Sequence, residues 1–563
     1  MPSPRRVAAV FQYPTAAEAN GLRWAALLQI AAALLWIPQA GSLGVAVGRI
    51  AAGQPASAVL WPAAIVLVLG IAKAALDACG QRLAFRHARG VLSDRRAQVA
   101  AALAARSPLD TSRPPSGLAA SVLTEQAEAI VAYLARFRPA RLRAAMVPLV
   151  IWLCVFSVSW LAALVLLVAA PLIPIFMALI GWRAKAAAER QLGEIGNMNA
   201  FLLDRLRGLA TIRAFGAVEA TATRVRAEGE SLRARTMAVL RIAFLSSAVL
   251  ELFAALGVAM VAVYVGFHLL GQLNFGAWNG RLSLGEALFV LLLAPAFFEP
   301  LRELSSAWHD RASGEAALDA LTRLGEGKAE LLGASTASAP EPCRMPPSVR
   351  IHALDYGYPT RNAPVFEGLS LAVAPGEHVA LLAPSGAGKS TLLALIAGFD
   401  APASGRIVIG DTMLTEQTAA GLRRRIAWIG QAPHIFAGTL ASNISLGRPQ
   451  IGPDKVHKTL DRMHLGHIRR RGTTAIGEGG TGLSGGEALR LALARAAVLP
   501  DATLVLADEP TAHLDSATAE DITTALLDFS RGRTLLVATH DPVLAARMDR
   551  IIRLDALPME AAA

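Results

Sequence analysis

Long apolar stretches constrain this chain more than any other feature of its sequence. Six of them precede residue 302, at 22–47, 57–80, 144–160, 161–182, 242–270 and 284–301. Each approaches or exceeds the ~20 residues that a helix needs to cross ~30 Å of hydrocarbon. Backbone polar groups inside a bilayer must be paired within their own segment, so we expect each stretch to be a helix. The sequence therefore predicts six transmembrane helices and argues against an ordinary soluble enzyme.

Basic residues are concentrated in two segments between these stretches. The formal net charge of +11 would also suit a nucleic-acid-binding protein. However, segment 82–143 holds 11 Arg against four acidic residues, and segment 183–241 holds 10 Arg and one Lys against six. The rest of the chain is nearly neutral. Arg and Lys accumulate on the cytoplasmic side of membrane proteins, so the charge predicts a multi-pass topology with both termini in the cytoplasm and no nucleic-acid partner.

Both basic segments are predicted to form helical hairpins outside the bilayer. Helix-forming runs at 82–105 and 184–206 continue the preceding spans. Pro, Gly and Asp interrupt the pattern near 107–117 and 207–219, where we expect the chain to turn. Short transverse helices at these turns would contact a soluble domain.

Ionisable residues within the spans are candidates for a polar cargo cavity or for structural pairs between helices. Lys73 and Asp77 are four residues apart and can pair on one helix face. Glu251 has no close sequence neighbour to neutralise it, so we expect it to line the cavity. The remaining candidates lie in or after the sixth span and are Glu286, Glu299, Arg302 and Glu303.

Composition divides the chain into five parts. A cytoplasmic segment at 1–20 precedes a transmembrane domain at 21–324. Residues 325–348 are rich in Ala, Ser, Gly and Pro and form a linker. Short β-rich runs alternate with helices at 349–555, which predicts an α/β domain, and 556–563 is a tail.

A phosphate-binding loop opens the chemistry of the α/β domain. The strand at 378–383 runs through a glycine-rich turn into a lysine, two hydroxyl residues and a helix. Backbone N–H groups and the helix N-terminus would hold the phosphates of ATP. Lys389 would face the β- and γ-phosphates and Ser390 would bind Mg²⁺, while Ala383 replaces the usual first glycine and is expected to alter nucleotide affinity. The candidate nucleotide-binding residues here are Ser385, Gly386, Ala387, Gly388, Lys389, Ser390 and Thr391.

Two further strands end in residues suited to phosphate chemistry. The strand in 503–511 delivers Asp508 and Glu509 to the carboxyl edge of the sheet, and the strand at 534–539 delivers His540. Asp508 would bind Mg²⁺ through water, and Glu509 would act as general base toward the attacking water. His540 would contact the γ-phosphate. Together with Lys389, these residues predict an ATP hydrolase.

A second anion-binding helix start lies at 483–487. Ser484, Gly485 and Gly486 open this helix, too far along the chain from the phosphate loop to serve the same nucleotide easily. Two chains facing each other would solve the problem, because each could offer this segment to the phosphate loop of the other. The sequence thus predicts a dimer with composite ATP sites.

These motifs in this order resemble those of ATP-binding cassette exporter half-transporters, over essentially the whole chain. The resemblance implies a type I exporter fold, in which an all-α domain of six transmembrane helices precedes an α/β P-loop domain. It also implies that Tyr358 stacks on adenine, that Gln431 senses Mg²⁺ and the membrane domain, and that Glu478 contacts the transverse helices. The loop at 512–515 would cross the dimer interface, with His513 in place of a small residue.

Three membrane segments, 204–216, 235–267 and 282–304, are similar to the CydDC exporter family. The resemblance implies a lipid-embedded heterodimer with a CydC-like half-transporter in the bacterial inner membrane. It further implies export of cysteine and glutathione to the periplasm in support of cytochrome bd assembly, with haem as a candidate cofactor of the complex. Two alternatives remain open, a homodimeric exporter of lipid, peptide or drug, and a haem-responsive assembly ATPase for which His309 is a candidate ligand.

Overall fold

The structure is a computed structural model. It describes residues 16–171, 198, 201–202, 204–206, 208–326, 330–334, 345–359, 363–384, 386–466, 476–477 and 482–554. The chain divides into two compact units, one of Met1–Leu103 with Pro114–Glu326 and one of Ala104–Arg113 with Gly327–Ala563. Each unit is considered by itself below.

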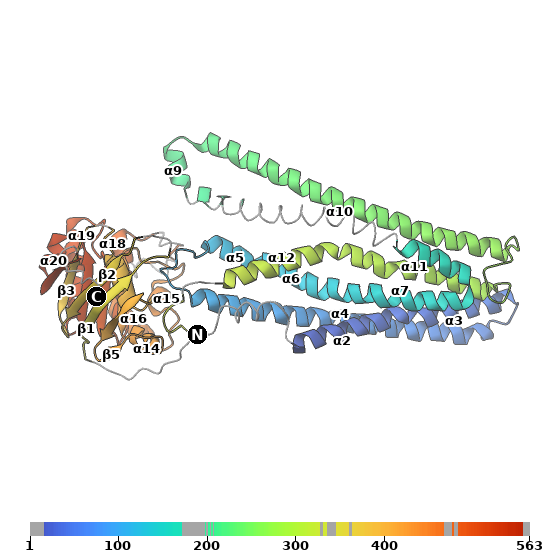
Figure 1. The fold of residues 1–563 in the computed structure, drawn as a ribbon, viewed down its shortest axis with the longest axis horizontal. Coiled ribbons are helices and arrows are strands. Elements are labelled where there is room, and N and C mark those ends of the chain that lie inside the picture. The colour runs from blue at the N-terminus through green and yellow to red at the C-terminus, as the bar shows by residue number, and fades with distance from the viewer. Residues whose placement is uncertain are drawn as a thin grey trace. The chain divides into compact units, whose positions relative to one another are not determined.

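The described part of the first unit is helical (Figure 1). Five of its helices are long and apolar enough to cross a membrane, namely Asn20–Ala51, Ser57–Ala104, Ser116–Val158, Ala248–Leu269 and Leu284–Gly325. The predicted span at 161–182 is helical over Trp160–Pro171, and its remaining residues lie outside the described ones. The elements are α2 (Ala16–Leu34), α3 (Trp36–Ala51), α4 (Ser57–Ala104), α5 (Ser116–Thr124), η1 (Gln126–Glu128), α6 (Ala129–Ala132), η2 (Tyr133–Phe137), α7 (Arg138–Val158), α9 (Leu209–Ala214), α10 (Val218–Leu269), α11 (Leu284–Ser306) and α12 (Trp308–Gly325).

Two glycines bring α3 and α11 into backbone contact. A Cβ built on Gly44 would lie 2.5 Å from the carbonyl oxygen of Gly285, and one built on Gly285 would lie 2.7 Å from that of Gly44. Lipid is as apolar as most side chains, so membrane helices gain most from such close packing of small residues. Any larger residue at either position would force the two helices apart.

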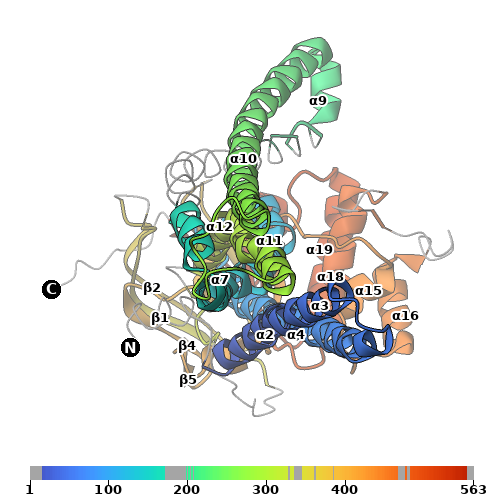
Figure 2. The ribbon, with the colours of Figure 1, turned by 90° about the vertical axis from the view of Figure 1, so that its right-hand side faces the viewer.

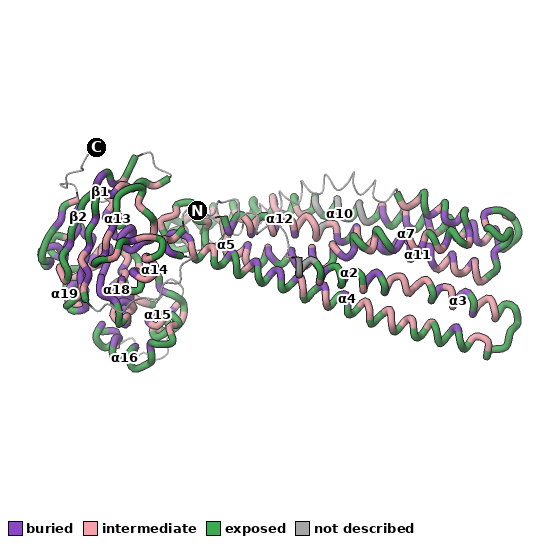
Figure 3. The backbone as a smooth tube through the Cα atoms, turned by 60° about the horizontal axis from the view of Figure 1, so that its bottom comes forward, coloured by how far each residue is buried: buried purple, intermediate pink, exposed green. Residues whose placement is uncertain are grey.

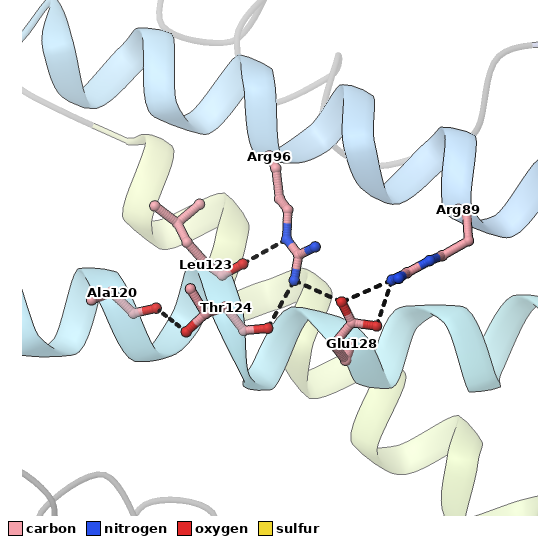
Figure 4. Close-up of polar contacts among 6 residues, drawn as sticks. All are labelled: Arg89, Arg96, Ala120, Leu123, Thr124 and Glu128. Atoms are coloured by element: carbon pink, nitrogen blue, oxygen red, sulfur yellow. Dashed lines mark hydrogen bonds and ion pairs between the residues drawn. The ribbon is translucent and has the colours of Figure 1, made fainter.

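An arginine-carboxylate cluster joins the long extension of α4 to the segment that returns toward the bilayer (Figure 4). Arg89 donates two hydrogen bonds to the Glu128 carboxylate, at 2.8 and 2.7 Å. Arg96 donates to the carbonyls of Leu123 and Thr124 at the end of α5 and also to Glu128. The last carbonyls of a helix lack internal partners, so Arg96 completes α5 while it ties this hairpin together.

The two expected turns of the basic segments differ in structure. Near 207–219 the chain contains the short helix α9, and α10 then returns along the first unit and meets α11 (Figures 1 and 2). Residues 107–115 contain no helix, and the nine-residue helix α5 begins at Ser116, at the end of the expected bend. Residues Ala104–Arg113 belong to the second unit, where Leu331 donates its N–H to the Ala105 carbonyl at 2.7 Å.

Most of the ionisable residues of the spans are paired. Glu251, the expected cavity residue, lies 2.9 Å from Arg302 on the neighbouring helix, which also binds Glu299 at 2.5 Å. Glu251 thus forms the structural pair between helices that was the alternative to a cavity role, with a partner 51 residues away in sequence. Each of the remaining groups has a different partner. Lys73 lies over the Trp36 ring, Asp77 accepts a hydrogen bond from Gln81, Glu286 contacts Ser283 at the start of α11, and Glu303 pairs with Arg143. The expected Lys73–Asp77 pair is thus replaced by other contacts.

The second unit contains two sheets. The antiparallel sheet has the order β2-β1-β4-β5, and the parallel sheet has the order β6-β7-β8-β3-β9. Every residue of β7 and β8 is buried, as expected for strands covered on both faces. Figure 3 shows buried residues gathered around α13 and α18 in the interior of this unit. The strands are β1 (Val349–Tyr356), β2 (Phe366–Val373), β3 (His378–Leu382), β4 (Ser404–Ile409), β5 (Thr412–Met413), β6 (Ile426–Ile429), β7 (Leu504–Asp508), β8 (Thr534–Thr539) and β9 (Arg550–Arg553). The helices are α13 (Lys389–Ile396), α14 (Ala419–Arg423), α15 (Leu440–Ser445), α16 (Pro453–Arg462), α18 (Gly485–Ala497), α19 (Ser516–Ser530) and α20 (Pro542–Ala546).

Candidate nucleotide site

The order of the parallel strands gathers the predicted chemistry at one edge of the sheet. Strand β8 lies between β7 and β3, and its last residues pair with the last residues of both neighbours. Leu382 is aligned with Thr539, and Asp508 is aligned with Ala538. The loops that follow these three strands therefore start at the same level, which is where ligands bind in open α/β sheets.

Two glycines shape the phosphate loop. Gly388 precedes α13 with a φ of 90°, and a Cβ there would lie 2.6 Å from Val365 Cγ1. Gly386 has a φ of 84° and faces open space, so its requirement for glycine is conformational. Ala383, in contrast, does not have a positive φ and is buried, so its methyl group is compatible with the turn. Ser385 lies outside the described residues, and Ala387 is half-buried.

Lys389, Glu509 and His540 form a connected set across the three strand ends. Lys389 is 7% exposed, and its Nζ donates to the carbonyls of Ala383 and Pro384 at 2.8 and 3.2 Å. The same Nζ lies 3.5 Å from Glu509 Oε1. Glu509 Oε2 lies 2.6 Å from His540 Nδ1. One carboxylate thus bridges a cation and an imidazole.

The backbone of Glu509 adopts an unusual conformation. Its φ is 49°, in the left-handed region that residues other than glycine seldom occupy. Its N–H donates to the Ala538 carbonyl at 2.8 Å, and its side chain is 11% exposed. Strain of this kind persists where the surrounding structure imposes it, most often at functional sites.

Asp508 supplies oxygens suited to a magnesium ion. It is 6% exposed, and burial raises the pKa of its carboxyl group, an effect partly opposed by a hydrogen bond with the Ser390 side chain. Its Oδ1 is buried and has no hydrogen-bond partner among the described residues. A buried carboxylate oxygen without a partner, beside a hydroxyl group, fits the oxygen ligands that Mg²⁺ prefers.

The remaining predicted nucleotide residues lie around this centre. The Tyr358 hydroxyl and Thr391 Oγ1 share a hydrogen bond of 2.8 Å, and the Tyr358 ring packs edge-on against Tyr356. Gln431 is exposed and follows β6, the strand beside β7. The structure therefore holds Tyr358 next to the first turn of α13.

Ser484, Gly485 and Gly486 begin α18 in another part of the domain. Ser484 caps the helix, and its N–H donates to Glu487 at 2.7 Å. A Cβ on Gly486 would lie 2.6 Å from Thr518 Cγ2, so glycine allows α18 to pack on α19. Within the described residues, no hydrogen bond or ion pair connects this segment to Lys389–Thr391. Glu478 lies outside the described residues.

Sequence reasoning missed a contact that links the two loops carrying Glu509 and His540. Thr511 Oγ1 donates to Asp541 Oδ2 at 3.1 Å, and Asp541 in turn caps α20. Both residues lie close in sequence to predicted site residues, since Thr511 is two positions after Glu509 and Asp541 follows His540. Their mutual contact, however, depends on the pairing of β7 with β8.

His309, the candidate haem ligand, belongs to α12, and its side chain lies outside the described ones. The described residues contain no group of three or more His, Cys, Asp or Glu side chains arranged to hold a metal ion.

Most of the chain matches known protein families and proteins of known name. Residues 25–295 match the ABC transporter transmembrane region, and residues 366–512 match the ABC transporter family. The chain is 34% identical to the transport ATP-binding protein AarD of Providencia stuartii, over 94% of this chain and 90% of that protein. It is 36% identical to the glutathione/L-cysteine transport system ATP-binding/permease protein CydD of Haemophilus influenzae, over 77% and 73%. The solved structure of a bacterial Atm1-family ABC exporter with ATP bound is similar at a TM-score of 0.78 and 24% identity, covering 96% of this chain and 93% of that one.

Proposed function

Because this chain belongs to the ATP-binding cassette exporters and couples ATP hydrolysis to transport through a type I exporter fold, we propose that its cargo is a small thiol, glutathione or cysteine. The observation that carries the proposal is similarity of 34–36% identity to proteins named as glutathione/L-cysteine transport systems, over 77–86% of this chain. We further propose that the chain is one half of a heterodimer in the bacterial inner membrane, with its ATPase domain in the cytoplasm. Support of cytochrome bd assembly is part of the same proposal.

The nucleotide site supports specific roles for its residues. Lys389 neutralises charge on the β- and γ-phosphates of ATP, exchanging its carbonyl partners for phosphate oxygens. Glu509 acts as general base toward the attacking water, and its position between Lys389 and His540 fixes the direction of its oxygens. His540 contacts the γ-phosphate. Ser390, Asp508 and Gln431 would hold Mg²⁺, which would supply positive charge to neutralise the phosphates.

The separation of the two anion-binding helix starts supports a two-chain site. Lys389–Thr391 begin α13, whereas Ser484–Gly486 begin α18, and the contacts of each are made with different elements. A second half-transporter would offer its own counterpart of Ser484–Gly486 to the phosphate loop of this chain. Tyr358 would then stack on adenine at the rim of the composite site.

Uptake by inverted membrane vesicles tests the proposal. Vesicles containing this chain and a CydC-like partner should accumulate labelled glutathione or cysteine when ATP is added. A Glu509→Gln variant of this chain, expressed to the same level, is the control for ATP-driven uptake. Accumulation no greater than that of the control would contradict thiol export. Equal uptake by vesicles containing this chain alone would contradict the heterodimer and favour a homodimeric exporter.

A further inference from the structure

A cavity of about 570 Å³ lies inside the first unit, among α2, α4, η2, α7 and α11. Its volume falls within the ~300–1,000 Å³ that is usual for small-molecule sites. Three arginines line it, Arg82, Arg136 and Arg143, and Glu303 is the one carboxylate among its described lining residues. The cavity is thus lined by an excess of positive charge.

The charges of the lining are only partly balanced. Glu303 Oε2 lies 2.7 Å from Arg143 Nη2, and this pair neutralises one arginine. Arg136 lies 3.2 Å from Asp310 but remains 64% exposed. Arg82 has no ion-pair partner among the described residues. Since guanidinium groups bind carboxylates through two parallel hydrogen bonds, Arg82 and Arg136 are available to an anionic ligand.

A buried polar donor without a partner also lines the cavity. Arg143 Nε is buried and makes no hydrogen bond with a described residue. Gln29 of α2 adds an amide side chain to the lining, on a residue that is 3% exposed. Buried polar groups are normally paired, so the unpaired Nε of Arg143 points to a ligand that would complete it.

A rare backbone conformation presents Arg136 to the cavity. Residues Tyr133–Phe137 form the π-helix η2 between α6 and α7. Such segments occur mostly as single turns and often at functional sites. The turn is held by close packing on α12, where Gly314 leaves no room for a Cβ beside Tyr133. The π-turn therefore sets the position of Arg136 relative to Arg143, seven residues later.

The cavity lies where a cargo would enter from the cytoplasm. Arg82 and Arg143 are the first and last basic residues of segment 82–143, so both mark the inner boundary of the membrane. Phe85 and three alanines supply the apolar part of the lining, and Gln81 and Ser306 add polar groups. An anion that accumulates at this boundary would meet guanidinium groups and a short apolar wall.

We propose that this cavity binds a small carboxylate-bearing anion before export. This inference rests on the proposed thiol export. Glutathione has two carboxylates and a net negative charge at neutral pH, whereas cysteine is zwitterionic, so the cavity selects glutathione over cysteine. Arg82 and Arg136 bind the carboxylates, and the Arg143–Glu303 pair positions the ligand between them.

Initial rates of uptake into inverted vesicles of the full heterodimer test this selectivity. Arg82→Gln and Arg136→Gln should each raise the KM for glutathione about ten- to hundredfold, because each removes a hydrogen bond between charged groups, and should change the KM for cysteine less than about twofold. Arg→Lys variants should recover part of the affinity. The matched control is Arg86→Gln, which removes an exposed arginine one turn further along α4 that does not line the cavity. Equal changes for both thiols, or none, would overturn the proposal.

Binding measured without transport separates this inference from the proposed function. Calorimetry on the purified heterodimer should detect glutathione and S-methylglutathione but not glutathione diethyl ester, and Arg136→Gln should weaken the first two. Such binding without any thiol uptake would overturn export and leave the cavity assignment standing. Thiol uptake, with glutathione binding unchanged by these variants, would support export and overturn the cavity assignment. Co-purified anionic lipid that is lost in Arg136→Gln, with no glutathione binding to the wild type, would identify a lipid phosphate as the occupant and overturn the proposal.

Discussion

Glu509 Oε2 lies 2.6 Å from His540 Nδ1, although the two residues follow different strands and are 31 positions apart. The other carboxylate oxygen of Glu509 faces Lys389 Nζ at 3.5 Å. These contacts hold the proposed general base between the residue proposed to bind the phosphates and the residue proposed to contact the γ-phosphate. The arrangement predicts that loss of the carboxylate affects chemistry far more than nucleotide binding.

Glu509→Gln should lower ATP turnover by about 10²–10⁴-fold, the usual contribution of a general base, while ATP affinity changes little. Turnover is measured by phosphate release from the heterodimer, and affinity by a fluorescent ATP analogue. Glu520→Gln, which removes an exposed carboxylate paired with Arg547 in the same unit, should leave turnover unchanged. Turnover within about tenfold of the wild-type value for Glu509→Gln would contradict the assigned role.

Ala383→Gly should not improve the nucleotide site. Ala383 is buried and does not require a positive φ, so glycine relieves no strain there. Glycine instead increases the freedom of the unfolded chain, and we expect a loss of about 0.5–1 kcal/mol in the free energy of unfolding. The KM for ATP and the thermal midpoint measure the two effects. A several-fold lower KM in the variant would show that the methyl group hinders the nucleotide.

Arg302→Gln should destabilise the protein more than Glu251→Gln does. Arg302 contacts both Glu251 and Glu299, so its removal leaves two carboxylates without a cation, whereas Glu251→Gln leaves the Arg302–Glu299 pair intact. The groups are partly exposed, and we expect a difference of about 1 kcal/mol. Thermal unfolding in lipid nanodiscs measures it, with the double variant completing the cycle. Equal losses would contradict a shared role for Arg302.

Asp515→Ala should destabilise the protein by an amount that persists into moderately acidic solution. Asp515 caps α19, and its hydrogen bonds with Thr518 lower the pKa of the carboxyl group. A pKa lowered by folding contributes stability that is present above the ordinary pKa of Asp and is lost only as the pH falls through the lowered value. The difference in thermal midpoint between variant and wild type should therefore be the same at pH 7 and at about pH 5.5, and should shrink as the pH falls below about 4. A difference that stays constant down to about pH 3 would contradict the shift.

Asp515→Asn provides the control for charge. Asn is as good a cap as Asp and does not titrate. This variant should match the wild type at neutral pH. If Asp515→Asn is as unstable as Asp515→Ala, the effect belongs to the charge of Asp515 rather than to its capping hydrogen bond.

Local sequence was sufficient for elements whose determinants lie within a few residues. The apolar runs around Ile65 and Leu292 are long enough to require helices, and the run into Gly388 and Lys389 requires a strand, a turn and a helix. Order along a parallel sheet then indicated that Asp508 and His540 reach one edge, because carboxyl ends of parallel strands coincide. Fold class was predictable for this reason, and the solved exporter structure confirms it.

Contacts between distant segments were not predictable in the same way. The pairing of Glu251 with Arg302, and of Thr511 with Asp541, depends on which helices and strands are neighbours. The turn at 105–115 is another example, because its structure depends on packing with residues near Leu331 in the second unit.

By itself, the sequence determined the long apolar helices, the location of the basic segments between them and the order of the ATPase motifs. These properties depend on local length, charge and chain order. Only the tertiary structure decided which charges are neutralised and where an arginine-lined cavity remains between Arg82 and Arg143. The physical reason is that hydrogen-bonded ion pairs form only between groups a few ångströms apart, and helix packing decides which side chains come within that distance.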